Sequence, residues 1–183
     1  MSTKTLVTAD EFESIAEQLG PCELVRGEVL RMSPAGFDHG RICANVTFLL
    51  EAWARRRESG RVLAGEAGIL TESDPDSVRG ADVAYISYER LPRGSEPSGF
   101  VTTPPELAVE IVGKGKTWKD LNVKVGEYLR MGVDRVWVID PTTRRVHVFR
   151  PDAEPTVLSE NDTMADEPSL PGFACGIAEL FTT

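Results

Sequence analysis

The stretch "PELAVEIV", residues 105–112, decides the fold, because it has the pattern of a buried strand with one acid in its middle. Successive strand residues point to opposite faces, so Ala108 and Glu110 share one face while Val109 and Ile111 share the other. A lone carboxylate on an apolar strand is costly to desolvate unless a cation pairs with it. The sequence therefore predicts a cationic partner for Glu110, either a basic side chain or a bound metal ion.

Two more acids lie on strands expected earlier in the chain. Asp82 stands at one end of the apolar stripe in "ADVAYIS", residues 81–87, and Glu66 lies toward the end of "RVLAGEAGIL", residues 61–70. Three acids on three strands can converge at one rim of a sheet, where they repel one another. Mg²⁺ favours one or two carboxylates together with water and substrate phosphates, so a divalent cation is the expected partner.

The helix expected at about residues 117–131 supplies a basic side chain. Leu121, Val125 and Tyr128 form its apolar stripe. Lys124 follows Leu121 by three positions and precedes Tyr128 by four, so its side chain points toward the core. A lysine on that side of a helix needs an acidic partner or a chemical role.

The remaining patterns predict one α/β domain over residues 1–183, with a mixed central sheet flanked by helices. We expect further helices at about 8–20 and 41–57, and a hairpin of two short strands around Arg26 and Gly27. The Asp-, Ser- and Pro-rich residues 71–80 are typical of a loop. Residues 134–140 and 145–150 form a second expected hairpin, and the tail suggests one or two short strands with a terminal helical turn.

Composition restricts the class of protein. The 183 residues are 41% hydrophobic and 27% charged, as in a soluble globular domain. No apolar run approaches the ~20 residues of a membrane span, and no signal-peptide pattern is present. Three scattered cysteines fit reduced thiols, so we expect a cytoplasmic protein without a membrane partner. The net charge of −9 argues against a large phosphate-neutralising surface, but it is compatible with a small acidic site that reaches phosphate through a metal ion.

Four segments together resemble the Uma2 family, a group of bacterial endonuclease domains in the PD-(D/E)XK nuclease superfamily. They are "CELVRGEVLRMSPAGFDHGRI" (22–42), "ADVAYIS" (81–87), "PELAVEIV" (105–112) and "KDLNVKVGEYLRMGVDRVWVIDP" (119–141). The resemblance covers the chain from about residue 7 to its end. It implies a restriction-endonuclease-like fold that hydrolyses DNA phosphodiester bonds with Mg²⁺ or Mn²⁺.

The superfamily pattern places an Asp on one strand and Glu-x-Lys on the next. Asp82 and Glu110 match the two acids, whereas Val112 occupies the lysine position. In this family the lysine resembles one that has moved to the following helix, where Lys124 is its match. The resemblance therefore implies Asp82, Glu110 and Lys124 as catalytic residues. Asp82 and Glu110 would be metal ligands, with Glu66 as a third candidate.

Each of these residues also has an ordinary structural interpretation. Glu110 could form an ion pair with Lys124 or an arginine, and Asp82 could cap the turn after Gly80. Lys124 could extend along the surface with its ammonium in water. Glu66 could be a solvated residue at a strand end.

Three other residues have more than one possible role. His39 follows a turn before the long helix and could be a helix cap, a loop residue or part of the site. Glu23 and Glu28 flank the first hairpin and are expected to face solvent, although Glu28 could approach the metal ligands.

Two functions from different classes remain. The first is a Mg²⁺- or Mn²⁺-dependent DNA endonuclease, most simply a homodimer, because cutting both strands requires two active sites related by symmetry. The second is a catalytically inactive nuclease-fold module for binding or dimerisation. The acidic net charge and Val112 at the lysine position favour this second function.

Overall fold

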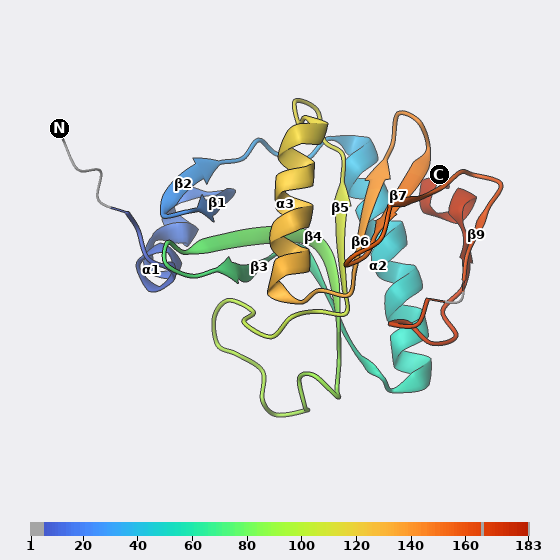
Figure 1. Ribbon diagram of the computed structural model, residues 1–183, viewed down its shortest axis with the longest axis horizontal. Helices are drawn as coiled ribbons and strands as arrows, with labels where there is room; N and C mark the ends of the chain where they lie inside the picture. Colours follow the sequence, from blue (N-terminus) through green and yellow to red (C-terminus); the bar gives the residue numbers. More distant parts are fainter. Residues whose placement is uncertain (1–5, 166, 183) are drawn as a thin grey trace.

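A mixed β-sheet forms the centre of the molecule (Figure 1). The protein is described by a computed structural model over residues 6–165 and 167–182. In these residues the main sheet has eight strands in the order β2-β1-β4-β5-β6-β7-β8, with β3 paired to β4. The strands are β1 (Cys22–Val25), β2 (Glu28–Arg31), β3 (Gly60–Glu72), β4 (Ser77–Ser87), β5 (Leu107–Ile111), β6 (Arg135–Asp140), β7 (Arg145–Phe149) and β8 (Thr156–Leu158).

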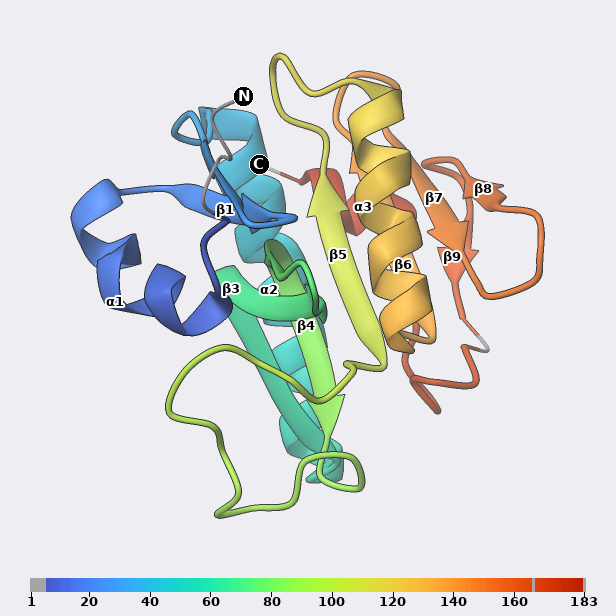
Figure 2. The same cartoon turned by 60° about the vertical axis from the view of Figure 1, so that its left-hand side comes forward.

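Two helices cover opposite faces of the sheet, as Figures 1 and 2 show. Helix α2 (Phe37–Arg57) packs on the face that carries Val109 and Ile111, and α3 (Trp118–Met131) packs on the face that carries Ala108. All five residues of β5 are buried. The predicted alternation along residues 107–111 and the mixed sheet between helices are therefore confirmed.

Helix α3 connects the two parallel strands of the sheet. Strands β5 and β6 run parallel, with Glu110 opposite Val138, and α3 is the crossover between them. A capping box at Thr117 and Asp120 starts the helix, and Gly132, at φ 108°, ends it. This crossover lays α3 along β5, so a core-facing side chain of the helix can reach Glu110.

The segment 71–80 corrects one prediction. We expected a loop, but β3 continues to Glu72 and β4 already begins at Ser77, leaving a short turn between them. Strand β1 pairs with β4 at Leu24 and Val78, so the start of β4 lies within the sheet and is buried there. The loop-like composition reflects only the turn itself, and Asp82 lies in a strand and caps no turn.

The other elements mostly follow the expected pattern. Helix α1 (Ala9–Leu19) lies within the expected range 8–20 and starts at a capping box of Thr8 and Glu11, and β1 and β2 form the predicted hairpin. Helix α2 starts at Phe37 and so includes residues that we had assigned to the preceding loop. The tail adds β9 (Thr163–Met164), β10 (Cys175–Gly176) and a short 3₁₀ helix (Ile177–Phe181). Among residues 6–165 and 167–182, no helix combines the length and the apolar character that a bilayer span requires.

Candidate active site

Asp82 lies where β4 and β5 separate. The two strands pair from Val83 opposite Val109 onward, whereas the earlier part of β4 turns toward β1. The carboxylate of Asp82 bridges this point, because its Oδ2 accepts a hydrogen bond of 2.6 Å from the backbone N–H of Ile111. The side chain is thereby held at the end of β5, one residue beyond Glu110.

A β-bulge on the neighbouring strand faces Asp82. Ala64 pairs with Val83 and Ala67 pairs with Ala81, so Gly65 and Glu66 together stand opposite Asp82. Both bulge residues have positive φ values, 84° and 60°. A bulge bends its strand and redirects nearby side chains, and such bulges are common beside active sites.

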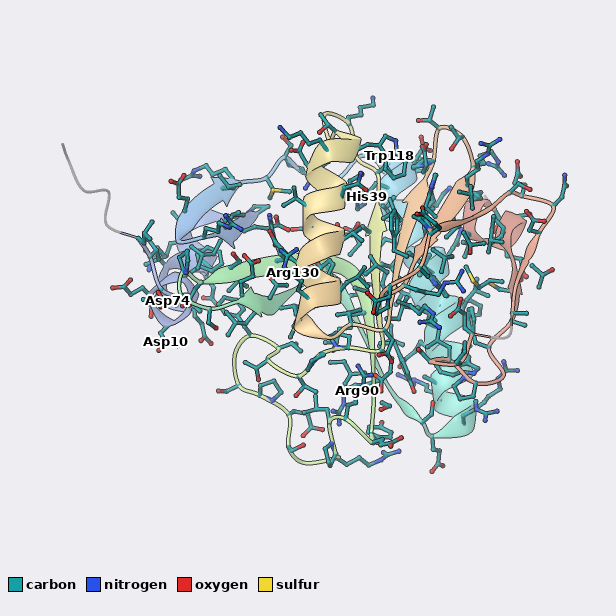
Figure 3. All side chains as sticks on the ribbon, viewed as in Figure 1. Asp10, His39, Asp74, Arg90, Trp118 and Arg130 are labelled. Atoms are coloured by element: carbon teal, nitrogen blue, oxygen red, sulfur yellow. The ribbon has the colours of Figure 1, made fainter. Side chains whose placement is uncertain are left out.

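His39 reaches Asp82 from the other side of the sheet. It is the third residue of α2, and its Nε2 lies 3.3 Å from Asp82 Oδ1. The hydrogen bond to Asp82 raises the pKa of His39, although burial opposes the change. Figure 3 shows His39 in the half of the molecule where α3 begins, close to Trp118 in this view. The structure thus places His39 in a helix beside the candidate site, because α2 begins earlier than expected.

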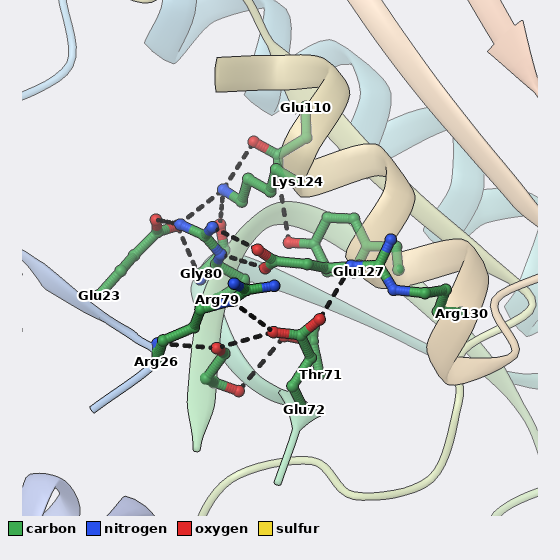
Figure 4. Close-up of polar contacts among 12 residues, drawn as sticks. Glu23, Arg26, Thr71, Glu72, Arg79, Gly80, Glu110, Lys124, Glu127 and Arg130 are labelled. Carbon is green, nitrogen blue, oxygen red and sulfur yellow. Dashed lines mark hydrogen bonds and ion pairs between the residues drawn. The ribbon is translucent and has the colours of Figure 1, made fainter. Parts of the chain in front are cut away.

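Glu110 is buried and accepts two hydrogen bonds from α3. Its Oε1 accepts from the Tyr128 hydroxyl at 2.9 Å, and its Oε2 accepts from Lys124 Nζ at 2.8 Å (Figure 4). The side chain is only 4% exposed. Burial raises the pKa of Glu110 to about 7, with Lys124 acting against this shift and the charge of Asp82 adding to it.

The ammonium group of Lys124 has three close partners. Its Nζ lies 2.8 Å from Glu110 Oε2, 2.8 Å from Glu23 Oε1 and 2.8 Å from the backbone oxygen of Gly80. Burial alone would lower the pKa of Lys124, but Glu110 and Glu23 outweigh it and hold the pKa above its usual range. Lys124 therefore points to the core beside Glu110, as its helical spacing predicted, and does not extend along the surface.

Glu23 continues this contact network away from Glu110. Its Oε2 lies 3.0 Å from Arg79 Nη1, and Arg79 in turn binds both carboxylate oxygens of Glu127. We define the Lys124 network as Glu110, Lys124, Glu23, Arg79 and Glu127, all of them buried. Our expectation that Glu23 faces solvent is wrong, because β1 lies beside β4 inside the sheet and turns Glu23 toward α3. Glu28, on the next strand, is exposed.

The donor chemistry of Asp82 and Glu110 fits a Mg²⁺ or Mn²⁺ ion. Burial and the repulsion between these two carboxylates disfavour the charged form of Glu110, and an adjacent cation would relieve both effects. Within the described residues there is no group of three or more His, Cys, Asp or Glu side chains arranged to hold a metal. Mg²⁺ is commonly bound by one or two carboxylates together with water, and Asp82 and Glu110 supply two. Glu66 is exposed on the bulge, and its role as a ligand stays a prediction.

Sequence reasoning did not identify several members of the Lys124 network. Arg79 was assigned to a loop, and Tyr128, which donates to Glu110 from outside the network as defined, was treated only as an apolar contact. Glu127 had a usable signal, because it follows Lys124 by three positions and so lies on the same buried side of α3. Two opposite charges on the core side of one helix indicate a buried ionic network.

Comparisons with known proteins identify the family and the fold. The sequence model of the Uma2 family, described as "Putative restriction endonuclease", matches residues 9–178. A crystal structure titled as "a putative nuclease belonging to DUF820" from Anabaena variabilis ATCC 29413 has a similar fold, with a TM-score of 0.80. The two sequences are 19% identical, and the match covers 96% of this chain and 97% of that chain. No curated protein matches the sequence.

Proposed function

The chain belongs to the Uma2 family, and from this premise we propose that it is a divalent-metal-dependent endonuclease that hydrolyses DNA phosphodiester bonds. One observation carries the proposal. Asp82 accepts a hydrogen bond from the backbone of Ile111, the residue after Glu110 on the adjacent strand, and Lys124 contacts Glu110 from the helix that follows. This arrangement supports the assignment of Asp82, Glu110 and Lys124 to the acid, acid and lysine of the superfamily pattern, although Val112 breaks the pattern in sequence.

Each residue has a distinct task in this proposal. Asp82 and Glu110 would hold Mg²⁺ or Mn²⁺ through their carboxylate oxygens, with Glu66 as a candidate third ligand. A divalent cation bound there polarises the scissile phosphate and lowers the pKa of a coordinated water. Lys124 orients the attacking water and offsets the negative charge that grows on the phosphate oxygens. His39 holds Asp82 in place from α2.

The acidic net charge fits a specific manner of binding DNA. A chain of net charge −9 gains little from general attraction to phosphates. We therefore propose that a bound metal ion and a small contact area, rather than a broad basic surface, bring the DNA backbone to the site. The reaction would take place in the cytoplasm, in keeping with the three unpaired cysteines.

We also propose a two-fold homodimer formed through the outer face of α2. Phe37 and Phe48 on this helix are 83% and 71% exposed, and Phe48 borders a shallow groove of about 670 Å³. Asp38 lies in the first turn of α2 and arginines 55–57 lie in its last turn. Antiparallel pairing of two α2 helices would cover the phenylalanines and set the acidic end of one helix against the basic end of the other.

A specific observation favours the second function, a catalytically inactive binding or dimerisation module. The ammonium of Lys124 already lies between Glu110 and Glu23, so the buried charges are paired without a metal ion. A module that had lost catalysis would keep such a network for stability alone.

Cleavage of supercoiled plasmid DNA by wild type and Asp82→Asn, with Mg²⁺, Mn²⁺ or EDTA, separates the two functions. The endonuclease proposal predicts metal-dependent nicking by the wild type and a loss of at least about a hundredfold in Asp82→Asn. Asp10→Asn, which changes an exposed acid on α1 away from the site and from α2, is the matched control and should cleave like wild type. Wild-type protein that cleaves no DNA with either metal would support the inactive module.

A further inference from the structure

Lys124 is shared between two carboxylates that differ in how firmly they are held. Glu110 accepts hydrogen bonds from the Lys124 ammonium and from the Tyr128 hydroxyl. One carboxylate oxygen of Glu23 contacts the Lys124 ammonium and accepts a hydrogen bond of 3.1 Å from the backbone N–H of Gly80. The other oxygen pairs with Arg79. Both carboxylates lie 2.8 Å from the same ammonium group. The lysine can therefore lose one acid and still keep the other.

Metal binding places conflicting demands on Glu110. In the structure Oε2 of Glu110 accepts from Lys124 and Oε1 accepts from Tyr128, so both oxygens are in use. Each oxygen can accept a second partner, but a cation bound by Glu110 would repel the ammonium beside it and weaken that bond. A buried ammonium left without an acid would be strongly destabilised. The site therefore needs a second acceptor for Lys124.

We propose that Glu23 is a positioning residue that retains the Lys124 ammonium while Glu110 turns to the metal ion. The inference rests on the proposed function for the metal ion, whereas the contacts of Glu23 are observed in the structure. Glu23 keeps the lysine within the site, close enough to act on the attacking water, and so makes Glu110 available as a ligand.

The surroundings of Glu23 suit this role. Arg79 holds its far oxygen at 3.0 Å and is itself fixed by two bonds to Glu127, which lies on the same helix as Lys124. The series of contacts from Lys124 through Glu23 and Arg79 to Glu127 thus begins and ends on α3. Burial would raise the pKa of Glu23, but Lys124 and Arg79 together hold it below the usual range, so the carboxylate stays charged.

The inference makes a prediction about metal affinity that needs no cleavage. Without Glu23, Lys124 would pair with Glu110 alone and compete with the cation for it. Glu23→Gln should therefore weaken Mn²⁺ binding by about tenfold, whereas the same change in a Lys124→Met background should alter it by less than about twofold. Electron paramagnetic resonance of free Mn²⁺, titrated with the full-length wild type, the two single variants and the double variant, measures all four affinities.

Two controls separate this role from general electrostatics and from misfolding. Glu106→Gln removes the charge of a buried acid that pairs with Arg90 and Ser87 outside the Lys124 network, so its Mn²⁺ affinity should stay within about twofold of wild type. Circular dichroism confirms that each variant is folded. Should Glu23→Gln yield too little folded protein, Glu23→Asp replaces it in the cycle, since its shorter side chain withdraws the carboxylate from Lys124.

The outcomes distinguish this inference from the proposed function. Equal weakening by Glu23→Gln in both backgrounds would mean that only its charge matters and would overturn the inference, as would unchanged affinity or a wild type that binds no Mn²⁺. The expected coupling in a protein that cleaves no DNA would sustain the role of Glu23 and refute the endonuclease. DNA cleavage by a protein that shows no such coupling would support the endonuclease and refute the role of Glu23.

Discussion

Glu110 combines two properties that seldom occur together in one residue. It lies in the middle of a buried strand, yet both of its oxygens have polar partners on a single helix, Lys124 and Tyr128. Its carboxylate is therefore fixed in direction, while its charge is destabilised by burial. A metal ligand benefits from both features, because the rigid strand presents the oxygen atoms and the cation restores the charged form.

The raised pKa of Glu110 predicts how stability depends on pH without metal. An acid whose pKa rises on folding stabilises the folded state below its unfolded pKa, here about 4.5, and loses this contribution as the pH rises through about 7. Relative to Glu110→Gln, the wild type should lose free energy of unfolding between pH 5 and pH 7.5, on the order of a few kcal/mol. Urea unfolding in EDTA measures the difference.

Glu72→Gln serves as the control for this measurement. Its bond to Arg130 is the main cause that lowers the pKa of Glu72, so any contribution from Glu72 is lost only as the pH falls below about 4.5. Between pH 5 and pH 7.5 its difference from wild type should stay constant. The same constant difference for Glu110→Gln would show that burial does not destabilise the Glu110 carboxylate.

The residues that sequence patterns could and could not place differ in the range of their contacts. The period of α3 was enough to direct Lys124 toward the core, because that direction depends only on neighbours within the helix. Glu23 and Arg79 contact each other across 56 positions of the chain, and only the pairing of β1 with β4 brings them together. No local pattern predicts that pairing, so Glu23 was expected to face solvent.

At the scale of elements, the hairpin of β3 and β4 sets the direction of Asp82. The Gly65–Glu66 bulge lies opposite Asp82, and beyond it β4 leaves β5 to join β1. The sequence indicated both strands but predicted too long a loop between them, because the ends of β3 and β4 were assigned to the loop along with the Asp- and Pro-rich turn. A bulge is a matter of register between strands, which the sequence of one strand does not reveal.

Gly65 tests the importance of the bulge, with Gly94 as a matched control. Both glycines have φ of 84°, and an added Cβ would meet no atom within 4 Å at either position. Replacement by alanine should cost each variant about 1 kcal/mol of stability, since the strain is the same. Only Gly65→Ala should also lower the cleavage rate, by about tenfold or more, because it shifts the strand opposite Asp82. Equal cleavage rates for the two variants would exclude a role for the bulge.

At the scale of the whole molecule, the two sides of the sheet have different roles. The α3 side carries the Lys124 network, whereas α2 supplies His39 at its start and an exposed apolar surface along its outer face. The general architecture, a mixed sheet between helices, followed from the alternation along β5 and the helical periods on either side. The exposed position of Phe48 did not, because the helical pattern around residues 41–57 does not show which apolar residues find a partner.

The proposed dimer predicts a mass that depends on Phe48. By light scattering at high micromolar concentration, the wild type should have twice the mass of one chain, and Phe48→Glu should have the mass of one chain. The carboxylate that Phe48→Glu introduces would be buried at the centre of the two-fold interface. It would face the same carboxylate of the other copy, with no cation to pair with. Val123→Glu, an exposed apolar position on α3, should leave the dimer intact. A monomeric wild type would refute the dimer.

The central claim is that Lys124 serves as the lysine that the pattern lacks at Val112. The most direct test is the Mg²⁺-dependent cleavage rate of supercoiled plasmid by Lys124→Met, compared with Lys119→Met, an exposed lysine on the same helix. Lys124→Met also removes the partner of two buried acids, so the assay is run at a temperature where circular dichroism shows the variant folded. If Lys124 has this role, the cleavage rate should fall by at least about a hundredfold in folded Lys124→Met and by less than about twofold in Lys119→Met. Cleavage by Lys124→Met at the wild-type rate would contradict it.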